Sequence, residues 1–332
     1  MPSLCSVASG LPRSMTNRRF LFFRTVLRAF AVLMLLMGGG LLPLCAQDAF
    51  ERVGRTYGDV DIYFWLDSVG PPSTRSVAMR VYGQLPRRLI PFTIDTGASI
   101  NVLSPRLARQ LGISPETDDS TEVEGVGVTT ARLAVADTLR LGNAVFLRVP
   151  FYIVDVLTGD SIVDSYLTHL EAILGRPLIE ALGTATFDFE SRHLTAPERP
   201  KKRQKRTRRS NLSIDDNNLL LTLTHQDDTL RLLPDFGATH TTLGPDYYDR
   251  HREQFASLHP DTVWFGGIGG LTQAVEYRLT DFPLWFSKRQ SVLVPSLTVS
   301  PSPTYEPRLG LDFFSRLHAV TIDFRRWRLT VK

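Results

Sequence analysis

The feature that most constrains this chain is a short acidic turn that occurs twice, 140 residues apart. In the first copy, an apolar, β-favouring run ends at Asp95, a hydroxyl residue and a glycine follow, and a second apolar run leads away through Val102. This order predicts a strand, a tight turn with the carboxylate at its tip, and a departing strand. Gly97 allows a backbone turn in which a Cβ would clash.

The second copy repeats this turn and much of what surrounds it. Asp235-Phe236-Gly237-Ala238-Thr239 aligns with Asp95-Thr96-Gly97-Ala98-Ser99, and in both copies a leucine follows eight residues after the aspartate and a proline ten residues after it. A glycine-rich segment comes about 30 residues further on in each half. These segments are Gly125-Val126-Gly127 and Gly267-Ile268-Gly269. Shared order and near-equal spacing predict an internal duplication.

The ends of the two halves also correspond. An apolar-apolar-Gly element, Ile173-Leu174-Gly175, lies in the first half, and Leu309-Gly310 aligns with its Leu-Gly in the second. In both halves an aspartate lies 13 residues beyond that glycine, as Asp188 and Asp323. Both aspartates stand among aromatic and β-branched residues, so we interpret them as structural acids at strand ends.

The chain resembles the retropepsin-like aspartic proteases, with two such lobes fused as in the pepsin-like enzymes. The resemblance covers about residues 60–332. It implies a mainly β, bilobal aspartic-protease fold of two pseudo-two-fold-related retropepsin-like β-barrel lobes with short helices. It also implies an aspartic endopeptidase whose catalytic residues are Asp95 and Asp235. The implied supporting residues of the active-site loops are Thr96, Gly97, Ala98, Ser99, Gly237, Ala238 and Thr239. The implied flap candidates are Gly125, Val126, Gly127, Gly267, Ile268 and Gly269.

The chemistry of such a site requires both carboxyls. One acts as a base towards a water, and the other acts as an acid towards the peptide carbonyl oxygen and the leaving amine. Two carboxyls about 3 Å apart cannot both be ionised, so they share a proton. Ala98 and Ala238 stand where pepsin has serine, and in the family this difference accompanies a mildly acidic to neutral optimum.

The second turn departs from the family pattern. Phe236 replaces the threonine or serine whose hydroxyl helps to lock the two loops together, and Pro234 removes a backbone donor just before Asp235. The alternative function is therefore a non-catalytic peptide-binding or partner-binding protein with a degenerate second lobe. A third possibility is a homodimer in which the first lobes of two chains pair through Asp95.

The predicted domains are a signal peptide at 1–46, an N-terminal lobe at 47–196, a basic linker at 197–217 and a C-terminal lobe at 218–332. Five arginines precede an apolar run and a cleavage signal before Gln47. The alternative for this segment is an uncleaved membrane anchor. We expect export to the periplasm or the extracellular space, with envelope association as a further possibility. Cys5 and Cys45 both lie before Gln47, so the mature chain lacks thiol chemistry.

The net charge of +4 does not indicate a nucleic-acid partner. Besides the five leader arginines, eight of the cations lie between residues 199 and 209, and the rest of the chain is acidic. The histidines show no ligand spacing, and the mature chain has no phosphate-binding loop. We therefore expect no cofactor and no metal. The expected partner is an extended peptide or unfolded protein, bound by a pseudo-symmetric monomer.

Overall fold

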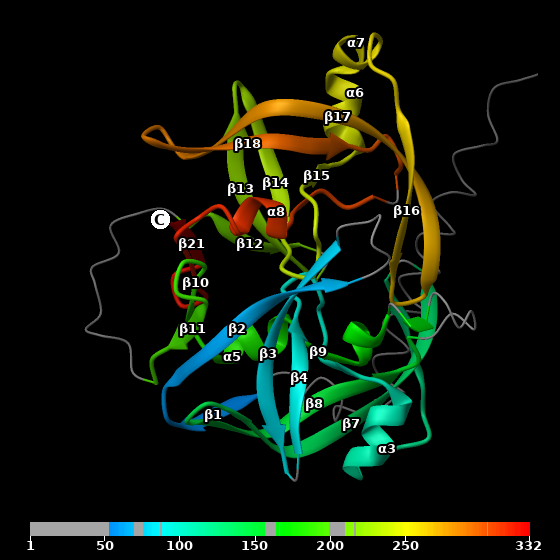
Figure 1. Ribbon diagram of the computed structural model, residues 1–332, viewed down its shortest axis with the longest axis vertical. Helices are drawn as coiled ribbons and strands as arrows, with labels where there is room; N and C mark the ends of the chain where they lie inside the picture. The colour runs from blue at the N-terminus through cyan, green and yellow to red at the C-terminus, as the bar shows by residue number, and fades with distance from the viewer. Residues whose placement is uncertain are drawn as a thin grey trace, which may run out of the picture. The chain divides into compact units, whose positions relative to one another are not determined.

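Strands hold most of the residues that the computed structural model describes, and they form two sheets (Figure 1). The structure describes residues 53–69, 76–86, 88–125, 127–156, 164–165, 167–198, 210–215, 217–303 and 305–332. The predicted signal peptide and residues 199–209 of the predicted basic linker lie outside these ranges. The mainly β fold class is confirmed.

The first sheet contains a closed ring of six strands. The ring runs β3, β4, β9, β5, β8 and β7, and it closes where Gln84 of β3 pairs with Arg140 of β7. The bounds are β3 Ser76–Leu85, β4 Arg88–Ile94, β5 Val102–Leu103, β7 Val128–Leu141, β8 Ala144–Val154 and β9 Ala172–Leu174. Two further strands join the ring, β1 Gly54–Tyr57 on β8 and β6 Thr121–Glu124 on β7.

The second sheet repeats this scheme with a ring of β13, β14, β19, β15, β18 and β17, closed between Thr224 and Trp285. The bounds are β13 Asn218–His225, β14 Asp228–Pro234, β15 Thr242–Leu243, β17 Gly270–Ser287, β18 Gln290–Val299 and β19 Arg308–Leu309. β16, Asp261–Gly267, pairs with β17.

The predicted linker needs one correction. β12, Leu212–Asp215, falls inside the range 197–217 but pairs with β13, so it belongs to the second sheet. Its two apolar residues, Leu212 and Ile214, alternate with polar ones, which is the two-residue period of a strand. The charged residues around it concealed this short pattern.

The strand that ends at each aspartate is held in the same way in both halves. β4 and β14 each pair in parallel with a short strand, β9 or β19, and that strand pairs antiparallel with β5 or β15. β5 and β15 then pair in parallel with β8 and β18. The register is also shared, because Ile94 pairs with Leu174 and Pro234 pairs with Leu309.

Antiparallel strands join the two halves. β2 Val60–Val69, β11 His193–Ala196 and β10 Thr184–Asp188 follow from the first ring, and β20 Ala319–Asp323 with β21 Arg328–Val331 continues the sheet from the second half. Thr186 of β10 lies opposite its counterpart Thr321 of β20, and their hydroxyls are 2.9 Å apart. An approximate two-fold relation between the halves therefore passes through this pair.

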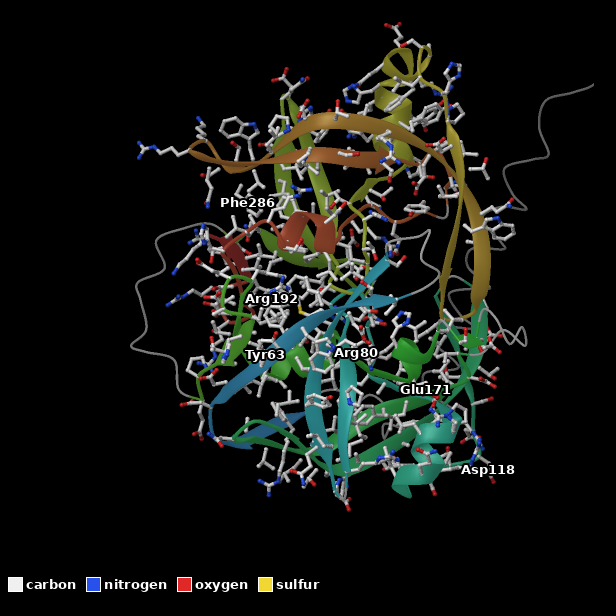
Figure 2. All side chains as sticks on the ribbon, in the orientation of Figure 1. Tyr63, Arg80, Asp118, Glu171, Arg192 and Phe286 are labelled. Atoms are coloured by element: carbon white, nitrogen blue, oxygen red, sulfur yellow. The ribbon has the colours of Figure 1, made fainter. Side chains whose placement is uncertain are left out.

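Ser104-Pro105, a hydroxyl N-cap followed by proline, favours a helix start, and a helix begins there. Ser104 caps α3, Pro105–Leu111, by accepting a hydrogen bond from the backbone of Leu107, and Gly112 ends it with a φ of 68°. The others are α5 Arg176–Ala181, α6 Pro245–Arg250, α7 Arg252–Phe255, α8 Leu311–Phe314 and the 3₁₀ turn η1 Thr168–Glu171. Polar side chains cover the loop after α3, where Asp118 is exposed (Figure 2). Among the described residues, none of the helices has the length and apolar character needed to cross a membrane.

Candidate active site

The two acidic turns have the same local structure. Asp95 Oδ1 accepts hydrogen bonds from the backbone N–H groups of Gly97 and Ala98, both at 2.9 Å. Asp235 Oδ1 accepts the equivalent bonds from Gly237 at 2.8 Å and Ala238 at 3.1 Å. In each turn one carboxylate oxygen is thus fixed by the backbone, which leaves Oδ2 available for other contacts.

The two carboxyls lie against each other's loops. A Cβ on Gly97 would stand 2.7 Å from Cγ of Asp235, and a Cβ on Gly237 would stand 2.4 Å from Cγ of Asp95. Any side chain at either glycine would therefore collide with the opposite carboxyl. This reciprocity accounts for both glycines and brings Asp95 and Asp235 together within one chain.

Thr96 locks the loops together from one side only. Its hydroxyl donates to the carbonyl of Pro234 and accepts the N–H of Phe236 at 3.0 Å. Phe236 has no hydroxyl with which to return these bonds, as expected from the sequence.

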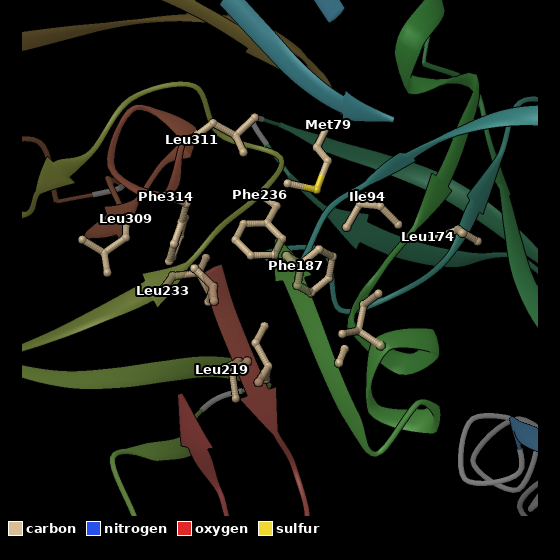
Figure 3. Close-up of a cluster of buried hydrophobic side chains, with 14 of the residues drawn as sticks. Met79, Ile94, Leu174, Phe187, Leu219, Leu233, Phe236, Leu309, Leu311 and Phe314 are labelled. Carbon is tan, nitrogen blue, oxygen red and sulfur yellow. The ribbon is translucent and has the colours of Figure 1, made fainter. Parts of the chain in front are cut away.

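Phe236 packs into the core between the lobes instead (Figure 3). Its ring is fully buried, with ring centroids 4.6 Å from Phe187 and 4.7 Å from Phe314. Both contacts are edge-to-face, a favourable geometry for aromatic pairs. The second loop is therefore held by aromatic packing where the family uses a hydroxyl.

Other loop residues anchor the turns to neighbouring elements. The carbonyls of Ala98 and Ala238 accept N–H bonds from Arg176 and Leu311, each at 2.8 Å, at the starts of α5 and α8. The hydroxyl of Thr239 accepts the N–H of Val77 at 2.9 Å, so the second loop is attached to the first strand of the first ring.

The electrostatics of the two carboxyls differ. Burial, followed by the nearby charge of Asp235, raises the pKa of Asp95 to about 7. Asp235 Oδ2 accepts a hydrogen bond from the Arg308 guanidinium at 3.1 Å. The cation therefore lies on the Asp235 side of the pair, and Asp95, with its raised pKa, holds the proton that the two carboxyls share.

Arg308 is a site residue that the sequence did not predict. It stands on β19 at the register position that Ile173 occupies on β9, immediately before the Leu-Gly that the duplication aligns. A cation at the start of an otherwise apolar element was the available signal. Its partner is 73 residues away, so the sequence did not indicate what the cation would contact.

The flap candidates of the two halves meet at their tips. Gly127 donates its N–H to the carbonyl of Ile268 at 3.3 Å, and a Cβ on Gly125 would stand 2.5 Å from that same oxygen. Gly269 adopts a φ of 92° beside Gly127. Gly267 ends β16, and Val126 lies outside the described residues.

Part of the first half of the chain is similar to a known protein family. Residues 77–178 match the family model described as aspartyl protease, a segment that contains Asp95 but not Asp235. The predicted resemblance to retropepsin-like aspartyl proteases is thereby confirmed for these residues. A crystal structure of a retropepsin-like aspartic protease from Rickettsia conorii is 16% identical, with a TM-score of 0.28, and the match covers 43% of this chain and 93% of that one. No match was found among curated proteins.

The raised pKa of Asp95 predicts a pH-dependent stability. A carboxyl that holds its proton more tightly when folded contributes stability that is fully present below its unfolded pKa and is lost as pH rises through about 7. Between about pH 4 and about pH 8, the unfolding free energy of the wild type should fall relative to Asp95→Asn by on the order of a few kcal/mol. Urea titrations at several pH values would measure this, with the exposed Asp227→Asn as control. Parallel curves for wild type and Asp95→Asn would contradict it.

Phe236→Thr tests which force holds the second loop. The new hydroxyl would add about 1 kcal/mol if it completed the lock. Removing a fully buried ring costs about 3–5 kcal/mol when the cavity stays open. We therefore expect a net loss of about 2–4 kcal/mol in urea unfolding. The control is Tyr63→Thr, which truncates a ring that is 57% exposed. A gain in stability for Phe236→Thr would show that the lock outweighs the packing.

Proposed function

We propose, from the match of residues 77–178 to the aspartyl protease family model, that the chain is an exported aspartic endopeptidase. In this proposal, Asp95 and Asp235 together activate a water that hydrolyses a peptide bond. The observation that carries it is the reciprocal approach of each carboxyl to the other loop's glycine. This approach within one chain favours an intramolecular pair over a homodimer that pairs first lobes.

The roles of the two carboxyls follow from their surroundings. Asp235, whose Oδ2 accepts a hydrogen bond from Arg308, takes a proton from the water. Asp95, whose pKa is about 7, is the protonated member and donates to the carbonyl oxygen of the substrate. Proton return to the leaving amine then completes the cleavage. The two loops have nearly the same backbone structure, so the neighbouring Arg308 and the raised pKa of Asp95 decide which carboxyl takes each role.

The flap tips support binding of an extended peptide. Gly127 and Ile268 meet by a backbone hydrogen bond, so the tips carry donors and acceptors that an extended chain could use as an added strand does. Closure of such tips over a peptide would exclude water from the carboxyls. An extended or unfolded stretch of protein is the substrate that fits this arrangement.

A non-catalytic binding protein is the second candidate. Two observations favour it: the lost hydroxyl at Phe236 and the ion pair that occupies one oxygen of Asp235. Such a protein would keep the paired loops and flap tips but would not turn over its ligand.

Substitution of each carboxyl separates these candidates. For an enzyme, Asp95→Asn and Asp235→Asn should each lower kcat for cleavage of an unfolded protein by about 100- to 10,000-fold. Pepstatin should inhibit the wild type. The control variant Asp227→Asn, which changes an exposed carboxyl, should have the kcat of the wild type. Equal activity in wild type and both dyad variants would refute the enzyme. Loss with Asp95→Asn alone would instead indicate the homodimer.

The pH–rate profile tests the role of Arg308. The wild type should work best at mildly acidic to neutral pH, and an optimum below about pH 3 would contradict the assignment of roles. The Arg308 cation lowers the pKa of Asp95, so Arg308→Ile should raise that pKa and move the alkaline limb to higher pH. Arg308→Lys keeps the charge and should leave the limb close to its wild-type position. An unchanged limb in Arg308→Ile would mean that the guanidinium does not act on the pair.

A further inference from the structure

An apolar cluster adjoins the active-site loop in the first lobe. Val102, Ala131, Val154 and Ile173 are all buried there, and Ala98 of the loop packs against them. Ile268, at the flap tip of the second lobe, packs on the same cluster. The first-lobe side of the candidate site is therefore apolar.

The equivalent positions of the second lobe are polar. The shared register places Thr242 where the first lobe has Val102, since each lies on the short strand parallel to β18 or β8. Arg308 likewise replaces Ile173.

The longest strands of the two rings give the third replacement. Leu133 pairs with Tyr152 on β8, and Arg278 pairs with Thr298 on β18, so these two pairs are equivalent. Two residues earlier on each strand, Glu276 of β17 therefore occupies the position equivalent to Ala131 of β7. A carboxyl thus replaces a buried methyl group beside the second loop.

Two of these polar replacements, Arg308 and Glu276, are connected to Asp235 by contacts. The Arg308 guanidinium bonds to Asp235 and lies over the ring of Tyr305, 5.8 Å from its centroid. The hydroxyl of Tyr305 donates to Oε1 of Glu276 at 3.1 Å. Glu276 is thus linked to the candidate dyad through two side chains, Tyr305 and Arg308, and all three residues are only partly buried.

Glu276 has no cation of its own among the residues that the structure describes. No basic group there lies within ion-pair distance of its carboxyl, and burial raises its pKa. The charges of His240 and Arg278 act on Glu276 without forming an ion pair with it, and each of the nearby cations has another contact. Arg308 pairs with Asp235, His240 lies 3.7 Å from Asp312, and Arg278 contacts Ser296.

We propose that Glu276 binds a basic side chain of the substrate, lysine or arginine, on the second-lobe side of the scissile bond. A partly buried carboxyl without an ion pair gains most from a cation that brings its own hydrogen-bond donors. This specificity rests on the proposed function, because it assumes that a peptide lies across Asp95 and Asp235.

Peptides that differ at one residue beside the cleaved bond test the specificity. Each carries lysine, norleucine or glutamate at that position, and kcat/KM is measured for the full chain. The wild type should prefer lysine over norleucine by about tenfold or more. Glu276→Ala, which installs the residue of the first lobe, should abolish this preference and favour norleucine. Glu276→Lys should favour glutamate.

Glu276→Gln guards against a folding defect in these variants. It keeps the side-chain volume and an oxygen that can accept from Tyr305, and it should still lose the lysine preference. The exposed Glu253→Ala removes the same charge elsewhere in the second lobe and should behave as wild type. An unchanged lysine preference in Glu276→Gln overturns the proposal.

A binding measurement separates failure of this proposal from failure of the proposed function. If the wild type cleaves no peptide, the enzyme is refuted, and fluorescence anisotropy with the same labelled peptides then tests Glu276 alone. Tighter binding of the lysine peptide to Asp95→Asn than to the Asp95→Asn, Glu276→Gln double variant supports the proposal. Equal binding of that peptide by both variants overturns it.

Discussion

The close approach of two carboxyls is the constraint on which the rest of the site depends. Each carboxyl is fixed by its own loop's backbone and faces the other loop's glycine, so neither loop can move without the other. Two adjacent anions would repel each other in this buried place. The proton held by Asp95 and the guanidinium of Arg308 remove that repulsion from opposite sides. Charge therefore distinguishes two halves that the backbone makes nearly equivalent.

The asymmetry extends from charge to packing. On the first side, Thr96 reaches across to the second loop by two hydrogen bonds. On the second side, Phe236 contributes a ring to the aromatic core that it shares with Phe187 and Phe314. The hydrogen bonds of Thr96 therefore need no counterpart from the second loop, because the buried ring of Phe236 holds that loop in place.

Much of this arrangement could be predicted from the sequence because its signals are local. The strand-turn patterns around Asp95 and Asp235, the helix start at Ser104 and the missing hydroxyl of Phe236 all follow from neighbouring residues. Arg308 and Glu276 could not be assigned contacts, because their partners lie far along the chain. The meeting of Gly127 with Ile268 depends on how the two rings are placed. β12 was not predicted, because its alternating pattern contains only two apolar residues, Leu212 and Ile214, and follows a charged run.

The pairing of β10 with β20 has a consequence for how the chain reaches its native state. Thr186 meets Thr321 across 135 residues, so the sheet edge of the first half stays unpaired until the last part of the chain is available. An open strand edge is a template for pairing with other chains, and such non-local pairing forms slowly. Synthesis and folding are thereby coupled over almost the whole length of the polypeptide. A chain that ended before residue 235 would leave this strand edge unpaired, and its Asp95 loop would have no opposite carboxyl.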